Sequence, residues 1–188
     1  MTARATLQTA VACVERMKTV GYLPASIGVF GTGARWNELR VWESSYPEAK
    51  ILGVDLRRKD RQRGNVRSVR TLAGDGSVDS VSFCWHCRSV VCTRGHWQYR
   101  AVEPVTTVDV LMTRMPKPYF LWIDVEGYEV AVLEGAKGAL QDTEYLNVEV
   151  QDYTPGYAGR IHDWLTAHGY MVDLDHQVSV DKLYRKVK

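Results

Sequence analysis

The segment YFLWIDVEGYEVAVLEGA, residues 119–136, constrains the fold of this chain more than any other stretch. An apolar run of the length of a buried strand ends in Asp124, and further acids follow before the spacing becomes helical. An apolar run that passes through a glycine-containing turn into a helix is typical of a parallel strand in an α/β sheet. The segment therefore predicts a strand at 119–124 and a helix at 129–140, with acids at the junction.

Hydrophobic spacing divides the rest of the chain into alternating strands and helices. A first helix at 4–20 is expected to bury one apolar face, made of Leu7, Val11, Val14 and Met17. The remaining predicted elements are strands at 25–31, 50–55, 65–72, 78–85 and 145–150, helices at 35–46, 106–112 and 158–169, and a C-terminal strand–turn–strand hairpin.

This alternation predicts an α/β fold with an open, mostly parallel sheet, helices on both faces and an antiparallel hairpin at the end. A chain of 188 residues fits one domain; within it, residues 1–24 hold the N-terminal helix and residues 84–105 form an insert. The net charge of +2 is too small to predict a polyanionic partner by itself. No segment has the features of a signal peptide or a membrane span, so a cytoplasmic, reducing location is expected.

Residues that directly follow the predicted strands are the first candidates for a binding site. Ligands of open α/β sheets bind beyond the carboxyl ends of the strands, near the point where the strand order reverses. The residues expected there, as cofactor-binding or catalytic groups, are Gly31, Gly33, Asp55, Asp75, Asp124 and Glu149.

The turn GVFGTGARW places Gly31 and Gly33 between a strand and a helix. Glycines allow a ligand to approach the backbone, and a helix N-terminus offers free N–H donors, although many such turns need glycine for conformational reasons alone. Asp55 ends the next strand, where an acid can accept hydrogen bonds from ribose hydroxyls. Together the two features favour a nucleoside-containing cofactor; the alternative is that Asp55 is a solvated acid.

Two other signals bear on the ligand. Arg35 and Trp36 occupy the region of the third small residue in a dinucleotide fingerprint, which disfavours a nicotinamide-dependent oxidoreductase. The basic run RRKDRQR, residues 57–63, is interpreted as a solvated helix face, and a role in binding a phosphorylated or nucleic-acid ligand is the less favoured interpretation.

The segment WIDVEGYEVAVLEGA resembles the signature of the FkbM-type methyltransferases, an apolar strand followed by I-D-V-E-G-A-E and then V-L-x-G-A. The matching residues are Asp124, Glu126, Gly127, Glu129, Leu133, Gly135 and Ala136. TTVDVLM, LNVEV and the closing HGY…DKLYRK resemble further elements of that family, so the similarity runs from about residue 25 to the C-terminus. The resemblance implies a Rossmann-like class I methyltransferase fold with a seven-stranded sheet, S-adenosylmethionine as cofactor, and a hydroxyl group of a sugar, glycan or small metabolite as methyl acceptor.

Methyl transfer to oxygen needs an aligned acceptor and a group that takes the hydroxyl proton. Asp124 is the first candidate for that group and a candidate for cofactor binding. Glu149 is a second acid or shares a magnesium ion with Asp124, since hard cations take carboxylate oxygens. For Glu126 and Glu129, capping of the helix N-terminus is an equally good explanation.

The segment FCWHCRSVVCTRGHW carries a possible zinc site outside the family resemblance. Three cysteines and one histidine could supply four tetrahedral ligands, although a cysteine on a strand is also a common buried residue. The candidate ligands are Cys84, Cys87, Cys92 and His96.

A non-catalytic alternative also follows from the sequence. Val29 and Arg35 replace an acid and a small residue of the family pattern, and residues 57–70 are rich in arginine. A degenerate S-adenosylmethionine-fold protein that binds a partner or nucleic acid would have these features, and cofactor affinity separates it from the enzyme. The oligomeric state has no sequence signal.

Overall fold

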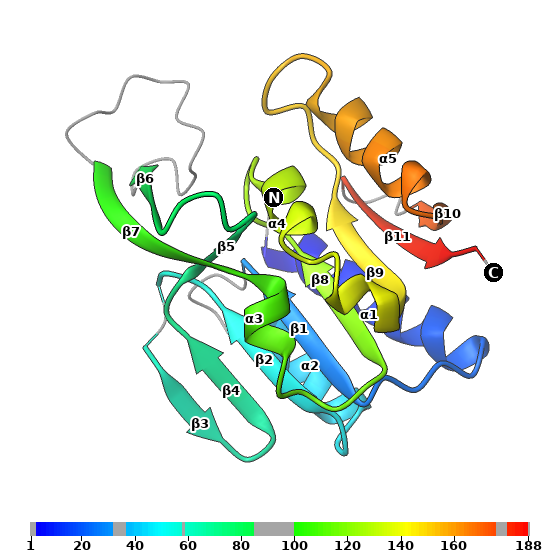
Figure 1. Cartoon of the computed structure of the whole chain (residues 1–188). Helices are drawn as coiled ribbons and strands as arrows, with labels where there is room; N and C mark the ends of the chain where they lie inside the picture. Colours follow the sequence, from blue (N-terminus) through cyan, green and yellow to red (C-terminus); the bar gives the residue numbers. More distant parts are fainter. Residues whose placement is uncertain (1–2, 32–36, 58, 85–99, 176–179, 188) are drawn as a thin grey trace.

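The computed structural model describes residues 3–31, 37–57, 59–84, 100–175 and 180–187. Its main sheet has eight strands in the order β10-β11-β9-β8-β1-β2-β4-β3 (Figure 1). These strands are β1 (Ser26–Phe30), β2 (Lys50–Val54), β3 (Arg61–Arg63), β4 (Val66–Val69), β8 (Tyr119–Ile123), β9 (Thr143–Glu149), β10 (Tyr170–Asp175) and β11 (Asp181–Lys186).

The α/β class is confirmed, but the expectation of seven strands in a mostly parallel sheet needs correction. The described sheet has eight strands and is mixed: β3 runs antiparallel to β4, and β11 runs antiparallel to both β9 and β10. The predicted C-terminal hairpin is confirmed as β10 and β11. The additional strand is β3, which lies in the basic run that was interpreted as a helix face. Its three residues are polar and exposed, so no hydrophobic pattern marks it as a strand.

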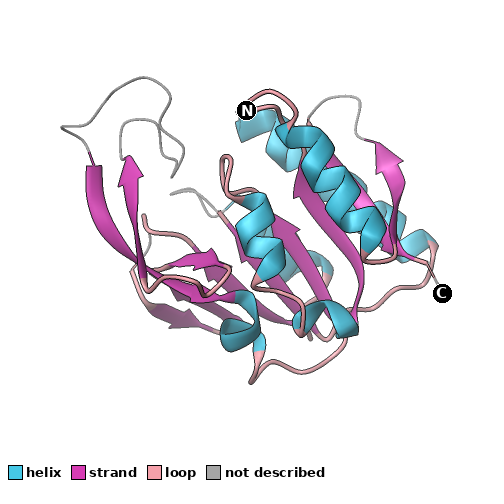
Figure 2. Ribbon diagram, turned by 45° about the horizontal axis from the view of Figure 1, so that its top comes forward, coloured by secondary structure: helices cyan, strands magenta, loops and turns pink. Residues whose placement is uncertain are grey.

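A second, three-stranded sheet lies beside the main one, as Figure 2 shows. It consists of β5 (Leu72–Gly74), β7 (Arg100–Thr107) and β6 (Ser80–Cys84), in that order. The strand predicted at 78–85 therefore exists but belongs to this small sheet, and the strand predicted at 65–72 is divided between β4 and β5. Of the predicted insert at 84–105, residues 85–99 lie outside the described parts of the chain.

Helices cover both faces of the main sheet, as predicted (Figure 1). The helices α1 (Ala3–Thr19) and α2 (Asn37–Ser45) pack on one face, and α3 (Val108–Met112), α4 (Glu129–Glu134) and α5 (Tyr157–Ala167) pack on the other. Alternate residues of each strand supply the two cores: Val29 and Trp122 face α1 and α2, whereas Phe30 and Ile123 face the other helices. Across the described residues, no helix combines the length and apolar character needed to cross a membrane.

The predicted buried face of the first helix is half right. Val14 and Met17 are buried, but Leu7 and Val11 are 37% and 42% exposed. The buried positions on the preceding turns are the smaller Ala10 and Cys13. Small side chains let a helix approach a neighbouring layer closely, so the contact face here follows size as well as hydrophobicity.

The helix predicted at 129–140 is only six residues long and ends at Glu134. Gly135 passes so close to β5 that a Cβ atom there would lie 1.8 Å from the carbonyl oxygen of Gly74. Asp109 then accepts hydrogen bonds from the N–H groups of Gly138 (2.9 Å) and Ala139 (2.7 Å), where a short 3₁₀ helix, η2 (Ala139–Asp142), begins. A backbone contact and a side-chain cap, neither visible as periodicity, thus divide the predicted helix.

Two glycine substitutions test this close approach. Gly135→Ala should lower the free energy of unfolding by about 2–3 kcal/mol, because its methyl group meets a backbone atom that cannot move aside. Gly159→Ala is the control: it lies in α5 with open space around it, and should raise stability by about 0.5–1 kcal/mol. Urea denaturation of both variants measures the difference, and equal effects would contradict the described contact.

Candidate active site

The carboxyl ends of four adjacent parallel strands meet at one edge of the main sheet. The register aligns the last residues of β1, β2 and β8, and carries β9 alongside them. The strand order reverses here, because the chain continues from β1 to β2 on one side and later returns to β8 on the other. Gly31, Asp55 and Asp124 directly follow β1, β2 and β8, and Glu149 is the last residue of β9. The structure therefore brings together four of the predicted site residues, whose roles stay predictions.

A pocket opens at this edge. Its apolar lining includes Leu56, Leu72, Ala73 and Phe83. Its polar lining consists of Asp55, Arg57, Thr71, Asp124 and Glu126. A largely apolar concavity with a few convergent polar groups is the usual form of a site for a small organic ligand.

Gly31 is required by the backbone on the rim of this pocket. Its φ angle is +88°, a conformation that side-chain-bearing residues rarely adopt. A Cβ atom at Gly31 would also lie 1.6 Å from the carbonyl oxygen of Asp124. The N–H group of Asp124 in turn donates to the carbonyl oxygen of Phe30 (2.9 Å). The glycine thus lets the chain segments after β1 and β8 approach closely; Gly33, the second predicted glycine, lies outside the described residues.

Asp55 is buried, only 6% exposed, and Arg57 holds its carboxylate. The Nε and terminal nitrogen of Arg57 donate to the two carboxylate oxygens at 2.9 and 2.7 Å, and the backbone N–H of Arg57 donates at 2.7 Å. Asp55 is therefore not the solvated acid of the alternative interpretation. Sequence reasoning missed Arg57 because it treated the basic run as a solvated surface, and a helix was expected where the chain forms this turn.

Tyr153 joins two acids on the other side of Asp124. Its hydroxyl group lies within hydrogen-bonding distance of Glu126 Oε2 (2.9 Å) and of Glu149 Oε2. A phenol has one hydrogen to donate, so both hydrogen bonds can form only if one of the two carboxyl groups is protonated and donates to the tyrosine oxygen. Tyr153 had no sequence signal, because the segment after β9 carries no recognisable motif.

Burial and repulsion from neighbouring carboxylates raise the pKa values of Glu149 and Asp124. Glu149 is 1% exposed, and burial together with neighbouring carboxylates raises its pKa to about 8, against the lowering effect of the Tyr153 hydrogen bond. The pKa of Asp124 also lies well above its usual range, first through burial and then through the charges of Glu149 and other acids. Asp181 of β11, fully buried and level with Glu149, adds to the repulsion.

The loop between β8 and α4 is built around a capping glutamate. Glu129 is fully buried, and its carboxylate accepts hydrogen bonds from the N–H groups of Val125 (3.2 Å) and Gly127 (3.1 Å). This supports the structural interpretation of Glu129. Glu126 has a φ angle of +55°, which is unfavourable for a glutamate. The loop therefore holds the Glu126 side chain at the pocket and in contact with Tyr153 at a conformational cost.

Asp75 lies outside the lining of this pocket. Its carboxylate is exposed and accepts hydrogen bonds from the backbone N–H (2.9 Å) and hydroxyl (2.7 Å) of Ser77, which lower its pKa. The contacts described for Asp75 are those of a turn-forming aspartate, and its predicted role in cofactor binding stays a prediction.

The metal predictions have no support in the described residues. Cys87, Cys92 and His96 fall within 85–99, outside those residues, and for Cys84 only the backbone at the end of β6 is described. In the described ranges, no three His, Cys, Asp or Glu side chains are arranged to hold a metal ion. Asp124 and Glu149, the pair expected to share magnesium, are among the described residues and belong to no such group.

Comparison with known proteins finds a similarity to one methyltransferase family. The family model described as the methyltransferase FkbM domain matches residues 85–172, which confirms the resemblance carried by the IDVEG segment. This part of the chain is therefore similar to the methyltransferase FkbM domain. No match was found among curated protein sequences.

Three solved structures show weak similarity. A 2.2 Å crystal structure of WbdD has a TM-score of 0.45 at 11% identity, covering 96% of this chain and 39% of WbdD. A co-crystal structure of WbdD with a kinase inhibitor gives 0.44 at 11%, covering 97% and 40%. A DUF574 family protein from Streptomyces avermitilis gives 0.47 at 12%, covering 98% and 83%. The chain thus spans about two fifths of WbdD, and similarities at this level carry no argument about function.

The raised pKa of Glu149 predicts a dependence of stability on pH. Its value of about 8 exceeds the roughly 4.3 of a glutamate in an unfolded chain. The stability that the protonated Glu149 side chain contributes is therefore fully present below about pH 4.3 and is lost as the pH rises to about 8. Glu149→Gln removes this titration, so relative to the wild type the variant should gain on the order of 2–4 kcal/mol in unfolding free energy between pH 5 and pH 8.5.

Urea denaturation at the two pH values measures this gain. Glu48→Gln, which replaces an exposed acid, is the control and should follow the wild type within about 0.5 kcal/mol. If the Glu149→Gln variant lost stability with pH as steeply as the wild type, Glu149 would not be the group that titrates.

Proposed function

We propose that this chain is an S-adenosylmethionine-dependent methyltransferase with a class I methyltransferase fold in a single domain. Its acceptor would be a hydroxyl oxygen of a sugar, glycan or small metabolite. The FkbM-type match supports methyl transfer; the acceptor class rests on the resemblance of the sequence to that family.

The observation that carries the proposal is the pocket at the switch in strand order. Gly31, Asp55 and Asp124 follow three neighbouring strands and meet there. Nucleotide-type ligands of open α/β sheets bind at such a point, with the first glycine turn on one side and an acid after the second strand. The same pocket would hold the cofactor in this chain.

The residues present fit S-adenosylmethionine, which supplies an activated methyl group when bound. Asp55 would accept hydrogen bonds from the ribose hydroxyls, sharing its carboxylate with Arg57 or exchanging that partner. Leu56, Leu72 and Phe83 offer an apolar lining for the adenine ring. The acids around Asp124 would attract the positive charge of the sulfonium and the ammonium group.

Asp124 would act as the proton acceptor for the hydroxyl group of the substrate. Its raised pKa makes it a stronger base than an exposed aspartate. The positively charged sulfonium of the cofactor, bound beside Asp124, would lower the pKa of Asp124 and favour its ionised form, which takes up the proton. Glu149 and Tyr153, which hydrogen-bond to each other, would hold a proton near Asp124.

The first experiment is calorimetric titration with S-adenosylhomocysteine, the product form of the cofactor. We expect saturable binding, at least about tenfold weaker in Asp55→Ala, because charge-assisted hydrogen bonds to the ribose are lost. Asp163→Ala, which removes an exposed acid from α5, should bind as the wild type does. No binding by folded protein would favour the non-catalytic alternative.

A second prediction separates chemistry from binding. Asp124→Asn keeps the shape of the side chain but cannot take up a proton, so we expect methyl transfer to fall by about 100-fold or more. The affinity for S-adenosylhomocysteine should change by less than about fivefold, because the ribose and adenine contacts remain. Transfer of a radiolabelled methyl group to a panel of hydroxylated acceptors measures the rate, and undiminished turnover would rule out Asp124 as the base.

A further inference from the structure

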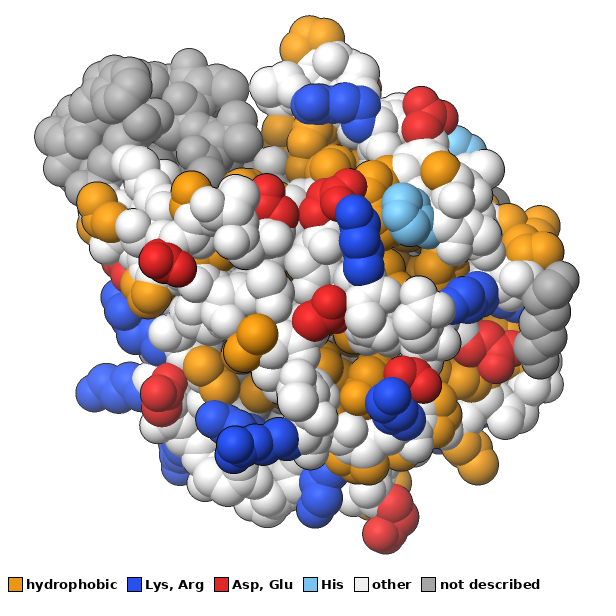
Figure 3. All heavy atoms as spheres, viewed as in Figure 1, with side chains coloured by type: hydrophobic (Ala, Val, Ile, Leu, Met, Phe, Trp, Pro, Cys, Tyr) orange, Lys and Arg blue, Asp and Glu red, His pale blue; other side chains and the backbone are white. Residues whose placement is uncertain are grey.

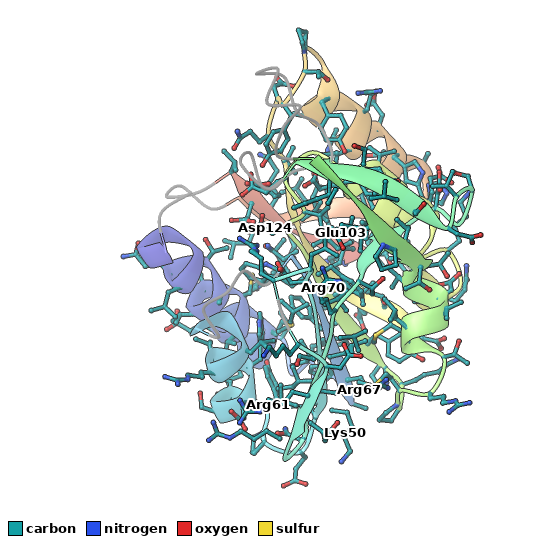
Figure 4. All side chains as sticks on the ribbon, turned by 90° about the vertical axis from the view of Figure 1, so that its left-hand side faces the viewer. Lys50, Arg61, Arg67, Arg70, Glu103 and Asp124 are labelled. Atoms are coloured by element: carbon teal, nitrogen blue, oxygen red, sulfur yellow. The ribbon has the colours of Figure 1, made fainter. Side chains whose placement is uncertain are left out.

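A second concavity lies away from the pocket, between α2 and the hairpin formed by β3 and β4. It is lined by Arg40 and Glu43 of α2, Arg61 and Arg63 of β3, and Val66 of β4. We call it the arginine groove. Figure 4 shows Arg61 low on the molecule and Asp124 near its middle. The arginine groove and the proposed cofactor pocket share no described lining residue, so the two sites are separate.

Strand register determines which side of the hairpin these arginines occupy. Arg61 pairs with Ser68, and Arg63 pairs with Val66, which is buried in the core beneath α1 and α2. Directly paired residues project from the same face of a sheet, so Arg61 and Arg63 extend on the α2 side. Arg67 alternates to the opposite face.

Arg40, Arg61 and Arg63 have unused hydrogen-bonding capacity. All three are exposed, and within the described parts of the chain none of them forms an ion pair. Two nearby arginines differ: Arg57 is held by Asp55, and Arg70 contacts Glu103 at 3.0 Å. Three like charges around one hollow repel each other, and the half-buried Glu43 is the one acid among the lining residues that the structure describes.

The chemistry of the lining identifies the ligand class. Guanidinium groups bind tetrahedral oxyanions through paired N–H···O hydrogen bonds. Among the described residues, the lining has no aromatic side chain on which a nucleobase could stack, as sites for single-stranded nucleic acids commonly have. We propose that the arginine groove binds a phosphate or sulfate group, either free or as an ester on a larger anionic ligand.

The location at the sheet edge supports this assignment. Charged residues on an edge strand hinder pairing with other chains, which accounts for a charge on β3. It does not account for Arg40, which comes from a helix and lines the same hollow. Figure 3 shows Lys and Arg side chains over the lower left of the molecule, where Figure 1 places the hairpin, so the surrounding surface would also attract anions.

The test uses tripolyphosphate and inorganic phosphate as probes, titrated calorimetrically into the full chain at low salt. We expect saturable tripolyphosphate binding that is at least about tenfold weaker in the double variant Arg61→Gln/Arg63→Gln. The matched control is Lys50→Gln/Arg67→Gln, which removes the same charge from residues outside the groove lining and should change affinity less than about threefold. Glu43→Gln should strengthen binding, because it removes a negative charge from the lining.

The outcomes separate the possible ligands. Saturable binding of inorganic phosphate with the same dependence on the variants would indicate a small free anion, and binding of tripolyphosphate alone would indicate a group on a larger ligand. Equal weakening in the two double variants, or no saturable binding, would overturn the proposal. So would binding of a single-stranded DNA decamer that requires Arg61 and Arg63 while tripolyphosphate does not bind.

Discussion

The close contact between the chain segments after β1 and β8 is the constraint on which the rest of the site depends. Gly31 can lie against the carbonyl oxygen of Asp124 only because it has no side chain. That contact brings the glycine turn and the acidic loop together where the strand order reverses. Asp55 enters the same pocket because β2 pairs with β1 in register. A pocket with an acid on each side of a glycine turn is therefore a consequence of strand pairing.

The acidic loop places negative charge where the fold offers little to balance it. Burial and the charges of neighbouring acids raise the pKa values of Asp124 and Glu149. Tyr153 lies within hydrogen-bonding distance of Glu126 and Glu149. Such a cluster lowers stability at neutral pH, a cost typical of residues retained for function. A cationic ligand would relieve the repulsion, which is consistent with the positively charged cofactor proposed here.

Much of this architecture could be predicted from the sequence, because apolar spacing reports burial. Apolar spacing predicted β8, β9, α5 and the C-terminal hairpin, and the position of Asp124 at the carboxyl edge.

Features that depend on contacts between distant segments could not be predicted. Arg57 binds Asp55 across a turn, Tyr153 reaches two acids, and Gly74 stops α4 at Gly135. The strand β3 has only exposed polar side chains and thus no periodic signal. Val29, a departure from the family pattern, faces the core beneath α1 and α2, where an acid would be buried among apolar residues.

The most direct test of the central claim is a crystal structure of the chain with S-adenosylhomocysteine. The claim is that the pocket at the carboxyl edge of β1, β2 and β8 holds the cofactor. We predict ribose hydroxyls within hydrogen-bonding distance of Asp55 and the ligand sulfur beside Asp124, with the backbone near Gly31 in its present conformation. A ligand bound elsewhere on the molecule, or a pocket that stays empty in crystals grown at saturating concentration, would contradict the account.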